Sequence, residues 1–359
     1  MARVFNFCAG PATLPEEVLR EAQADLVDYR GAGLSIMEAS HRGPEYDAVH
    51  EEAIANLRTL MDLPASYAVL LLHGGASGQF AMAPLNLLPV DGVADYVCSG
   101  AWASKAIKEA QTVGRVNVAA DTSEARPVRM PRPDEVRTTP GAAYLHVTSN
   151  ETIAGTQMKT FPASDAPLVA DMSSDILSRP LDVRPFGLIY AGAQKNLGPA
   201  GLAVVVIRRD LAGHARPGVP AFLRYATHLK ANSLYNTPPC FAVYMLALTT
   251  RWLMRQGGVE AMARRHAAKA GKLYAAIDAS DFYRGTAVTE DRSPMNVTFR
   301  LPDEGLETRF ATEADAAGLK QLKGHRSVGG LRASIYNAFP EAGVDALVAF
   351  MKDFERRRG

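Results

Sequence analysis

A repeated two-part unit most strongly constrains how this chain can fold. Each unit is a short apolar run followed by a loop of small and polar residues, and the runs occupy residues 67–72, 95–98, 142–147, 167–170 and 188–191. Amphipathic segments separate the units, which is typical of a mainly parallel sheet covered by helices. Because ligands bind beyond the carboxyl ends of the strands in such sheets, we expect the five loops to share one edge.

The pattern changes after about residue 256. Helical and strand-like segments then alternate, over residues 259–277, 295–301, 306–319, 331–337 and 344–354. We interpret residues 13–256 as a large α/β domain. Residues 257–359 are then a smaller C-terminal α+β domain, joined by the N-terminal segment 1–12.

An amphipathic helix is predicted over residues 15–31. Pro15 suits the first position of a helix and Gly31 suits its end. The apolar residues Val18, Ala22, Leu26 and Tyr29 follow one face, at the spacing of an α-helix.

Charge and cysteine content exclude several classes of protein. The 39 basic and 38 acidic residues leave a net charge of +1, so no overall field attracts nucleic acid or a membrane. The most apolar helical segment, residues 241–254, contains threonines and Arg251 and is too short to cross a bilayer. Cys8, Cys98 and Cys240 are widely spaced and support neither a disulfide framework nor a metal site, so we expect a reducing cytoplasm.

A lone lysine follows the last apolar run. Lys195 is the only cation between Arg184 and Arg208, and an ammonium beside buried strands is costly unless it serves a function. Asp171 directly follows the run 167–170, so both side chains are expected at neighbouring strand ends. Such a pair suits pyridoxal phosphate, because lysine forms an imine with its aldehyde and a carboxylate keeps its ring nitrogen protonated. On these two residues alone, a structural ion pair is equally compatible.

Two further features favour the cofactor. Residues 74–79 (GGASGQ) are predicted to expose the N–H groups of Ala76 and Ser77 at a helix N-terminus, where a phosphate is favoured. The loop lacks the Walker and dinucleotide-binding patterns, so by itself it is also compatible with an ordinary turn. Trp102 follows the second run, where its ring could stack on a flat cofactor or fill the core.

Nine stretches form an ordered set that is more specific than any one of them. They cover residues 5–15, 35–46, 71–88, 99–106, 149–157, 169–180, 190–202, 235–241 and 323–340. With these stretches the chain resembles the phosphoserine aminotransferase family, part of the fold type I group of pyridoxal phosphate enzymes. The resemblance implies an α/β fold whose mainly parallel, seven-stranded type of sheet is sandwiched by helices.

The resemblance also implies which residues do the chemistry. Lys195 would carry the Schiff base, and Asp171 would pair with the pyridinium nitrogen. Trp102 would stack on the ring. Thr152, within NETIAG, would donate a hydrogen bond to the cofactor.

Other residues are implied to hold the cofactor phosphate. Ala76, Ser77 and Gln194 would bind it within the same chain. Asn236 and Thr237 of YNTPP would reach the phosphate in a partner subunit, which implies a homodimer with shared active sites. From the local sequence alone, Asn236 and Thr237 are compatible with a capped loop.

Substrate recognition is implied by a set of basic residues. Arg332 resembles the family's clamp for the α-carboxylate, for which a guanidinium has the matching two-pronged geometry. Two histidine–arginine pairs are implied to receive the distal phosphate or carboxylate, namely His41, Arg42, His325 and Arg326. Either pair alone is also compatible with a solvated surface cluster.

Two positions differ from other members of the family. Ala9 stands at a substrate-binding position where some members carry a hydroxyl, so only its backbone could contribute. Ser77 stands where others carry arginine, which would give the cofactor phosphate a neutral cradle.

The implied reaction moves an amino group from L-glutamate to the phosphorylated 2-oxo acid 3-phosphohydroxypyruvate, giving 2-oxoglutarate and O-phospho-L-serine by a ping-pong cycle. The four-carbon analogue of pyridoxine synthesis is a further possible substrate. An alanine–glyoxylate aminotransferase or a cysteine desulfurase is the nearest alternative, although a desulfurase needs a reactive cysteine on a mobile loop. A non-catalytic phosphate-binding module would leave Lys195 and Asp171 without a role.

Overall fold

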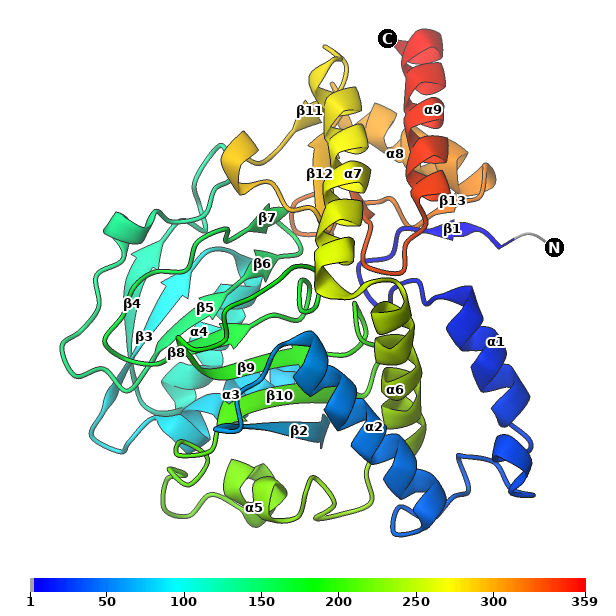
Figure 1. The fold of residues 1–359 in the computed structure, drawn as a ribbon. Coiled ribbons are helices and arrows are strands. Elements are labelled where there is room, and N and C mark those ends of the chain that lie inside the picture. The colour runs from blue at the N-terminus through cyan, green and yellow to red at the C-terminus, as the bar shows by residue number, and fades with distance from the viewer. Residues whose placement is uncertain (1–2) are drawn as a thin grey trace.

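A seven-stranded sheet forms the centre of the computed structural model, which describes residues 3–359. Met1 and Ala2, which the predicted N-terminal segment includes, lie outside the described residues. The strand order is β2-β10-β9-β8-β5-β3-β4 (Figure 1). β10 runs antiparallel to both neighbours, and the other adjacent pairs are parallel. The strands are β2 (Tyr67–His73), β3 (Val93–Cys98), β4 (Arg115–Asp121), β5 (Leu145–Thr148), β8 (Leu168–Asp171), β9 (Phe186–Gly192) and β10 (Leu202–Arg208).

The five predicted loops lie on one edge of this sheet. β2 and β9 both run antiparallel to β10, so they are parallel to each other. Together with β3, β5 and β8 they therefore send their carboxyl ends to the same edge, as expected from the sequence. The predicted α/β class with a mainly parallel sheet is confirmed.

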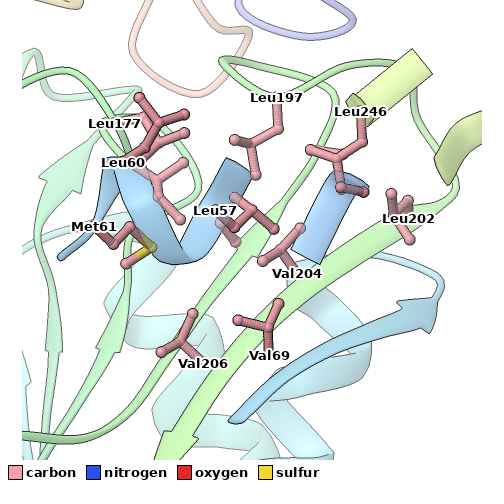
Figure 2. Close-up of a cluster of buried hydrophobic side chains, with 14 of the residues drawn as sticks. Leu57, Leu60, Met61, Val69, Leu177, Leu197, Leu202, Val204, Val206 and Leu246 are labelled. Carbon is pink, nitrogen blue, oxygen red and sulfur yellow. The ribbon is translucent and has the colours of Figure 1, made fainter. Parts of the chain in front are cut away.

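Helices cover both faces of the sheet because its central strands are apolar on both sides. On one face, Leu57 of α2 (Pro44–Leu60) and Leu246 of α6 (Cys240–Arg255) pack in one core cluster with Val204 and Val206 of β10 (Figure 2). On the other face, α3 (Ala76–Leu87) and α4 (Ala101–Val113) pack in a second cluster that includes Val205. Alternate residues of β10 thus enter opposite cores.

A second, smaller sheet lies in the C-terminal part of the chain, at the top of Figure 1. Its antiparallel strands are in the order β11-β12-β14. β1 (Phe5–Asn6) pairs in parallel with β13 (Leu319–Lys320), so the N-terminal segment joins this part. The elements are α7 (Gly258–Asp278), β11 (Arg284–Gly285), β12 (Asn296–Arg300), α8 (Glu304–Ala316), β14 (Leu331–Ser334) and α9 (Glu341–Arg358). The division into domains at residue 256 stays a prediction.

The helix predicted over residues 15–31 is too long. α1 spans Glu16–Asp25, and a short 3-10 helix follows at Tyr29–Gly31. Leu26 is 42% exposed rather than buried. The chain turns because the Asp28 carboxylate accepts a hydrogen bond from the Gly33 N–H at 2.7 Å, a local bond that competes with a helix.

The remaining helices are short. α5 (Tyr225–Lys230) and 3-10 turns at Pro133–Glu135, Ala221–Leu223 and Thr289–Asp291 complete the set in the described residues. Within residues 3–359, no helix has both the length and the apolar character needed to span a lipid bilayer.

Candidate active site

Lys195 lies in the turn that connects β9 to β10. Its Nζ donates a hydrogen bond to Thr152 Oγ1 at 2.7 Å and lies 5.6 Å from the centre of the Trp102 ring. Burial lowers the pKa of Lys195 to about 8, against the opposing effect of the Asp171 and Glu151 carboxylates. The amine is therefore more easily deprotonated than an ordinary lysine, as a nucleophile or base requires.

Asp171 is the last residue of β8 and is buried. Its Oδ1 accepts hydrogen bonds from the Ser173 N–H at 2.9 Å and from the Ser173 hydroxyl at 2.6 Å. Burial raises the pKa of Asp171, while the Ser173 hydroxyl and the charge of Lys195 act in the opposite direction. Both hydrogen bonds use Oδ1, so Oδ2 is left to accept a hydrogen bond from the N–H of a bound ring.

Trp102 lies in the first turn of α4 rather than in the preceding loop. The side chain is half-buried and packs against the core on that face of the sheet. Its Nε1 is buried without a hydrogen-bond partner among residues 3–359. The Lys105 ammonium also approaches the ring, 4.2 Å from its centre.

The predicted phosphate loop leads directly into α3. Ala76 is the first helical residue, and no side chain caps the helix at Gly75. Gly74 has φ +93°, in the left-handed region that favours glycine, which lets the chain turn from β2 into the helix. Among residues 3–359, the N–H groups of Ala76 and Ser77 have no hydrogen-bond partner, so they are suited to bind an anion. Ser77 is exposed beside them.

Gln194 directly precedes Lys195, and a hydrogen bond holds its backbone in place. Its carbonyl accepts the Ala12 N–H at 2.9 Å. A Cβ at Gly192 would lie 2.6 Å from Gln194 Oε1, so glycine leaves room for this side chain. No hydrogen bond joins Gln194 to Ala76 or Ser77 among residues 3–359.

Arg332 lies on β14, next to Thr152, the residue that accepts the hydrogen bond from Lys195. Its Nη1 donates to the Thr152 carbonyl at 3.4 Å, and burial lowers its pKa. The Ala9 carbonyl accepts a hydrogen bond from Tyr336 at 2.9 Å, four residues beyond Arg332. The structure thus brings Arg332, Thr152, Lys195 and Trp102 together.

The two histidine–arginine pairs differ in their surroundings. His325 Nδ1 is bonded to the Ser327 hydroxyl at 2.7 Å. Burial lowers the pKa of His325, and so do the nearby charges of Arg332, Arg326 and Lys105, which indicates a shared positive region. Arg326 is exposed.

The first pair has no polar contact with this group in the described residues. His41 Nε2 is buried without a partner in the described residues, and Arg42 is exposed. No hydrogen bond or ion pair among residues 3–359 joins either one to Lys195, Arg332 or His325.

Asn236 and Thr237 contact the end of β2. The Thr237 carbonyl lies 2.8 Å from His73 Nε2, and Asn236 Nδ2 lies 3.1 Å from the same nitrogen. His73 directly precedes the glycine loop, so both residues lie beside the start of this loop in their own chain.

Sequence comparisons settle which family this is. Residues 4–347 match the family model described as aminotransferase class-V. The phosphoserine aminotransferase of Pseudomonas paraeruginosa is 56% identical over 358 residues, which are 99% of this chain and 99% of that protein. The chain belongs to the phosphoserine aminotransferase family.

Two solved phosphoserine aminotransferases share its fold. The structure from Bacillus circulans subsp. alkalophilus is 52% identical with a TM-score of 0.97, covering 99% of both chains. A pyridoxal phosphate-bound structure from Trichomonas vaginalis is 40% identical with a TM-score of 0.94, covering 98% of this chain and 100% of that one. The alternatives of an alanine–glyoxylate aminotransferase or a desulfurase are not favoured.

The residues of this phosphoserine aminotransferase family member fit pyridoxal phosphate. An easily deprotonated amine, a buried carboxylate with a free oxygen and an uncapped helix N-terminus match the aldehyde, the ring nitrogen and the phosphate. The Trp102 ring beside Lys195 supplies a flat apolar surface.

Sequence reasoning missed three residues at this site. Ser173 bonds Asp171, Lys105 lies over Trp102, and the buried Glu151 bonds the backbone of Trp102 at 3.2 Å. Glu151 could have been identified from the sequence, because it is a carboxylate that directly precedes Thr152 and follows an apolar strand. Lys105 could not, because a lysine on an amphipathic helix is usually a solvated residue.

Proposed function

We propose that this chain transfers the amino group of L-glutamate to 3-phosphohydroxypyruvate, giving 2-oxoglutarate and O-phospho-L-serine. One observation carries the proposal. In a chain 56% identical to a phosphoserine aminotransferase, Lys195 is held beside Thr152 and Trp102 at the edge of the sheet where Asp171 ends β8.

Pyridoxal phosphate, when bound, supplies an aldehyde and a ring that withdraws electrons from the substrate's α-carbon. Lys195 would hold the aldehyde until the substrate amine displaces it, and its freed amine would then act as general base and acid, moving the proton from the α-carbon to the carbon that held the lysine. Asp171 would keep a proton on the ring nitrogen. Thr152 Oγ1 orients the Lys195 nitrogen, and Trp102 excludes water from one side of the ring.

The N-terminus of α3 is proposed to hold the cofactor phosphate, with Ala76, Ser77 and Gln194 as its partners. Positive potential at a helix N-terminus stabilises such a group without a basic side chain. This accounts for a neutral Ser77 at the loop.

The substrate-binding residues are proposed to recognise two anionic groups on each substrate. Glutamate and 3-phosphohydroxypyruvate each carry a carboxylate beside the reacting carbon and a second anion at the far end. Arg332 binds the first, and His325 with Arg326 binds the second, with Ala9 contributing only its backbone. The four-carbon phosphorylated analogue meets the same requirements.

A homodimer is proposed to complete the site. His41 and Arg42 have no hydrogen bond or ion pair to Lys195, Arg332 or His325 among residues 3–359, and we propose that they act in the site of the partner subunit. Asn236 and Thr237 are proposed to reach the partner's cofactor phosphate. We also propose a cytoplasmic location, in keeping with the free cysteines Cys8, Cys98 and Cys240.

A coupled assay with phosphoserine and 2-oxoglutarate tests the proposal, with alanine and aspartate as competing donors. We expect turnover with phosphoserine and little with the other two. Lys195→Ala should abolish turnover while the protein stays folded, because the proton carrier is lost. Faster turnover with alanine, or full activity in Lys195→Ala, would refute the assignment.

A further inference from the structure

A buried carboxylate lies beneath the candidate site and has no role in the chemistry above. Glu151 ends β6 (Asn150–Glu151), which forms a short hairpin with β7 (Thr156–Gln157). Its side chain is fully buried and reaches across to α4. Oε2 accepts the N–H of Trp102 at 3.2 Å, and Oε1 accepts the N–H of Ala103 at 3.0 Å.

The backbone of Glu151 is fixed at the same time. Its carbonyl accepts the Gly155 N–H at 2.8 Å, which closes the hairpin turn. The next residue, Thr152, accepts the hydrogen bond from Lys195. Residues 151 and 152 therefore hold two parts of the candidate site. Glu151 holds the Trp102 ring through the backbone of α4, and Thr152 holds the amine of Lys195.

Helix capping alone does not explain this arrangement. A serine or aspartate at position 100 could cap α4 locally. Instead the chain has Gly100 there, without a side chain to cap the helix, and the carboxylate comes from a segment about fifty residues later. Burying a carboxylate is costly even with hydrogen bonds, and burial raises the pKa of Glu151 to about 7 although the two N–H groups oppose the shift.

Gly100 leaves the space that the carboxylate occupies. A Cβ at this position would lie 2.7 Å from Glu151 Cδ, and the three nearest atoms all belong to Glu151. Its φ of 166° is extended backbone that any residue adopts, so the requirement for glycine at position 100 comes from Glu151.

We propose that Glu151 is a positioning residue, which holds the Trp102 ring at a fixed place relative to Lys195 by anchoring the first turn of α4 to the hairpin that carries Thr152. The inference rests on the proposed roles of Trp102 and Lys195. It predicts that loss of the anchor displaces the ring before it affects the rest of the fold.

Trp102 fluorescence in the cofactor-free protein tests this directly. The chain has two tryptophans, so Trp252→Phe leaves Trp102 as the only one. In that background, Glu151→Ala should shift the emission to longer wavelength and increase quenching by acrylamide. Glu151→Gln should restore part of the signal, because its carbonyl oxygen can still accept one N–H. Glu151→Ala should also weaken pyridoxal phosphate binding about tenfold, and Glu151→Gln less.

Asp303→Ala is the matched control. Asp303 also bonds a helix N-terminus, accepting the Leu306 N–H at 2.8 Å, but it caps α8. This variant should lose stability without any change in Trp102 emission or cofactor binding. If Glu151→Ala behaves in the same way, Glu151 is only a helix cap and the inference is wrong.

A second route covers the case in which Glu151→Ala does not fold. Gly100→Ala keeps the carboxylate but forces it aside, so it should reproduce the change in Trp102 emission. Gly213→Ala, where an added Cβ meets nothing within 4 Å, is its control. Wild-type emission in Gly100→Ala would overturn the inference. A wild-type chain that fails to bind pyridoxal phosphate would refute the proposed function, while the emission of the cofactor-free variants would still decide the role of Glu151.

Discussion

Burial, more than the neighbouring residues in the sequence, determines the pKa values of the charged residues at the sheet edge. Lys195 has an apolar strand on each side, and the loss of water around its amine lowers the pKa to about 8 even though two carboxylates oppose this. Asp171 is affected in the opposite sense, because burial disfavours its charged form as well and so raises its pKa. The pKa values of Lys195 and Asp171 are therefore closer together than those of a free lysine and a free aspartate.

The pKa of Lys195 leads to a prediction about reactivity. Only the neutral amine reacts with an acylating reagent, and a lowered pKa makes it available at lower pH. In the cofactor-free protein, the acylation rate of Lys195 should rise through about pH 8, whereas an ordinary lysine rises through about pH 10.4. Peptide mapping after brief labelling between pH 6 and 10 measures this. A midpoint near that of surface lysines would contradict the assigned environment.

Arg332 should affect both substrates alike. Replacing it by alanine removes a two-pronged, charge-assisted contact, so KM for glutamate and for 3-phosphohydroxypyruvate should each rise roughly 10- to 100-fold. Arg332→Lys keeps the charge without the geometry and should give a smaller rise. Steady-state kinetics for each half-reaction checks this, and a rise for only one substrate would mean that the two are not bound by a common clamp.

At the scale of elements, the start of α3 is proposed to bind phosphate through its backbone. Ala76→Pro tests this, because proline is tolerated at the first helical position but has no N–H. The affinity for pyridoxal phosphate should fall roughly 10- to 100-fold, as expected for one lost hydrogen bond to a charged group, without loss of stability. Glu304→Pro, at the first position of α8, is the control. Unchanged affinity in Ala76→Pro would rule out this N–H as a ligand.

The sequence predicts elements well where their pattern is local. The apolar runs that became β2 and β9 are recognisable because both sides of each strand are buried. The end of α1 was not predictable, because it depends on the Asp28–Gly33 bond and on Tyr29 packing against Tyr244, far away in the chain. Trp102 was expected in a loop because the carboxylate that starts its helix early comes from Glu151.

At the scale of the whole molecule, the C-terminal part contacts the lysine turn through Asn337. Its N–H donates to Asn196 Oδ1 at 3.0 Å, and its side chain bonds the Leu177 carbonyl at 3.0 Å and His266 Nε2 at 2.7 Å. Asn196 directly follows Lys195. The position of the lysine is therefore coupled to the packing of the C-terminal part.

Asn337→Ala should show how much the side chain of this residue stabilises the fold, because the backbone N–H that bonds Asn196 is kept. Two buried polar groups, the Leu177 carbonyl and His266 Nε2, would lose their partner, so the free energy of unfolding should fall by about 2 kcal/mol or more. Urea unfolding measures this. Gln23→Ala, the loss of an exposed amide on α1, should change stability by less than about 0.5 kcal/mol. An equal effect of both substitutions would contradict a stabilising role for the side-chain bonds of Asn337.

The pairing of β1 with β13 affects the order of events during synthesis. Phe5 leaves the ribosome well before its partner Leu319 emerges. The large sheet can assemble while the nascent chain is still growing, but Ala9 and Arg332 cannot come together until Arg332 has also emerged. The synthesis of residue 332 therefore limits how early the site becomes competent.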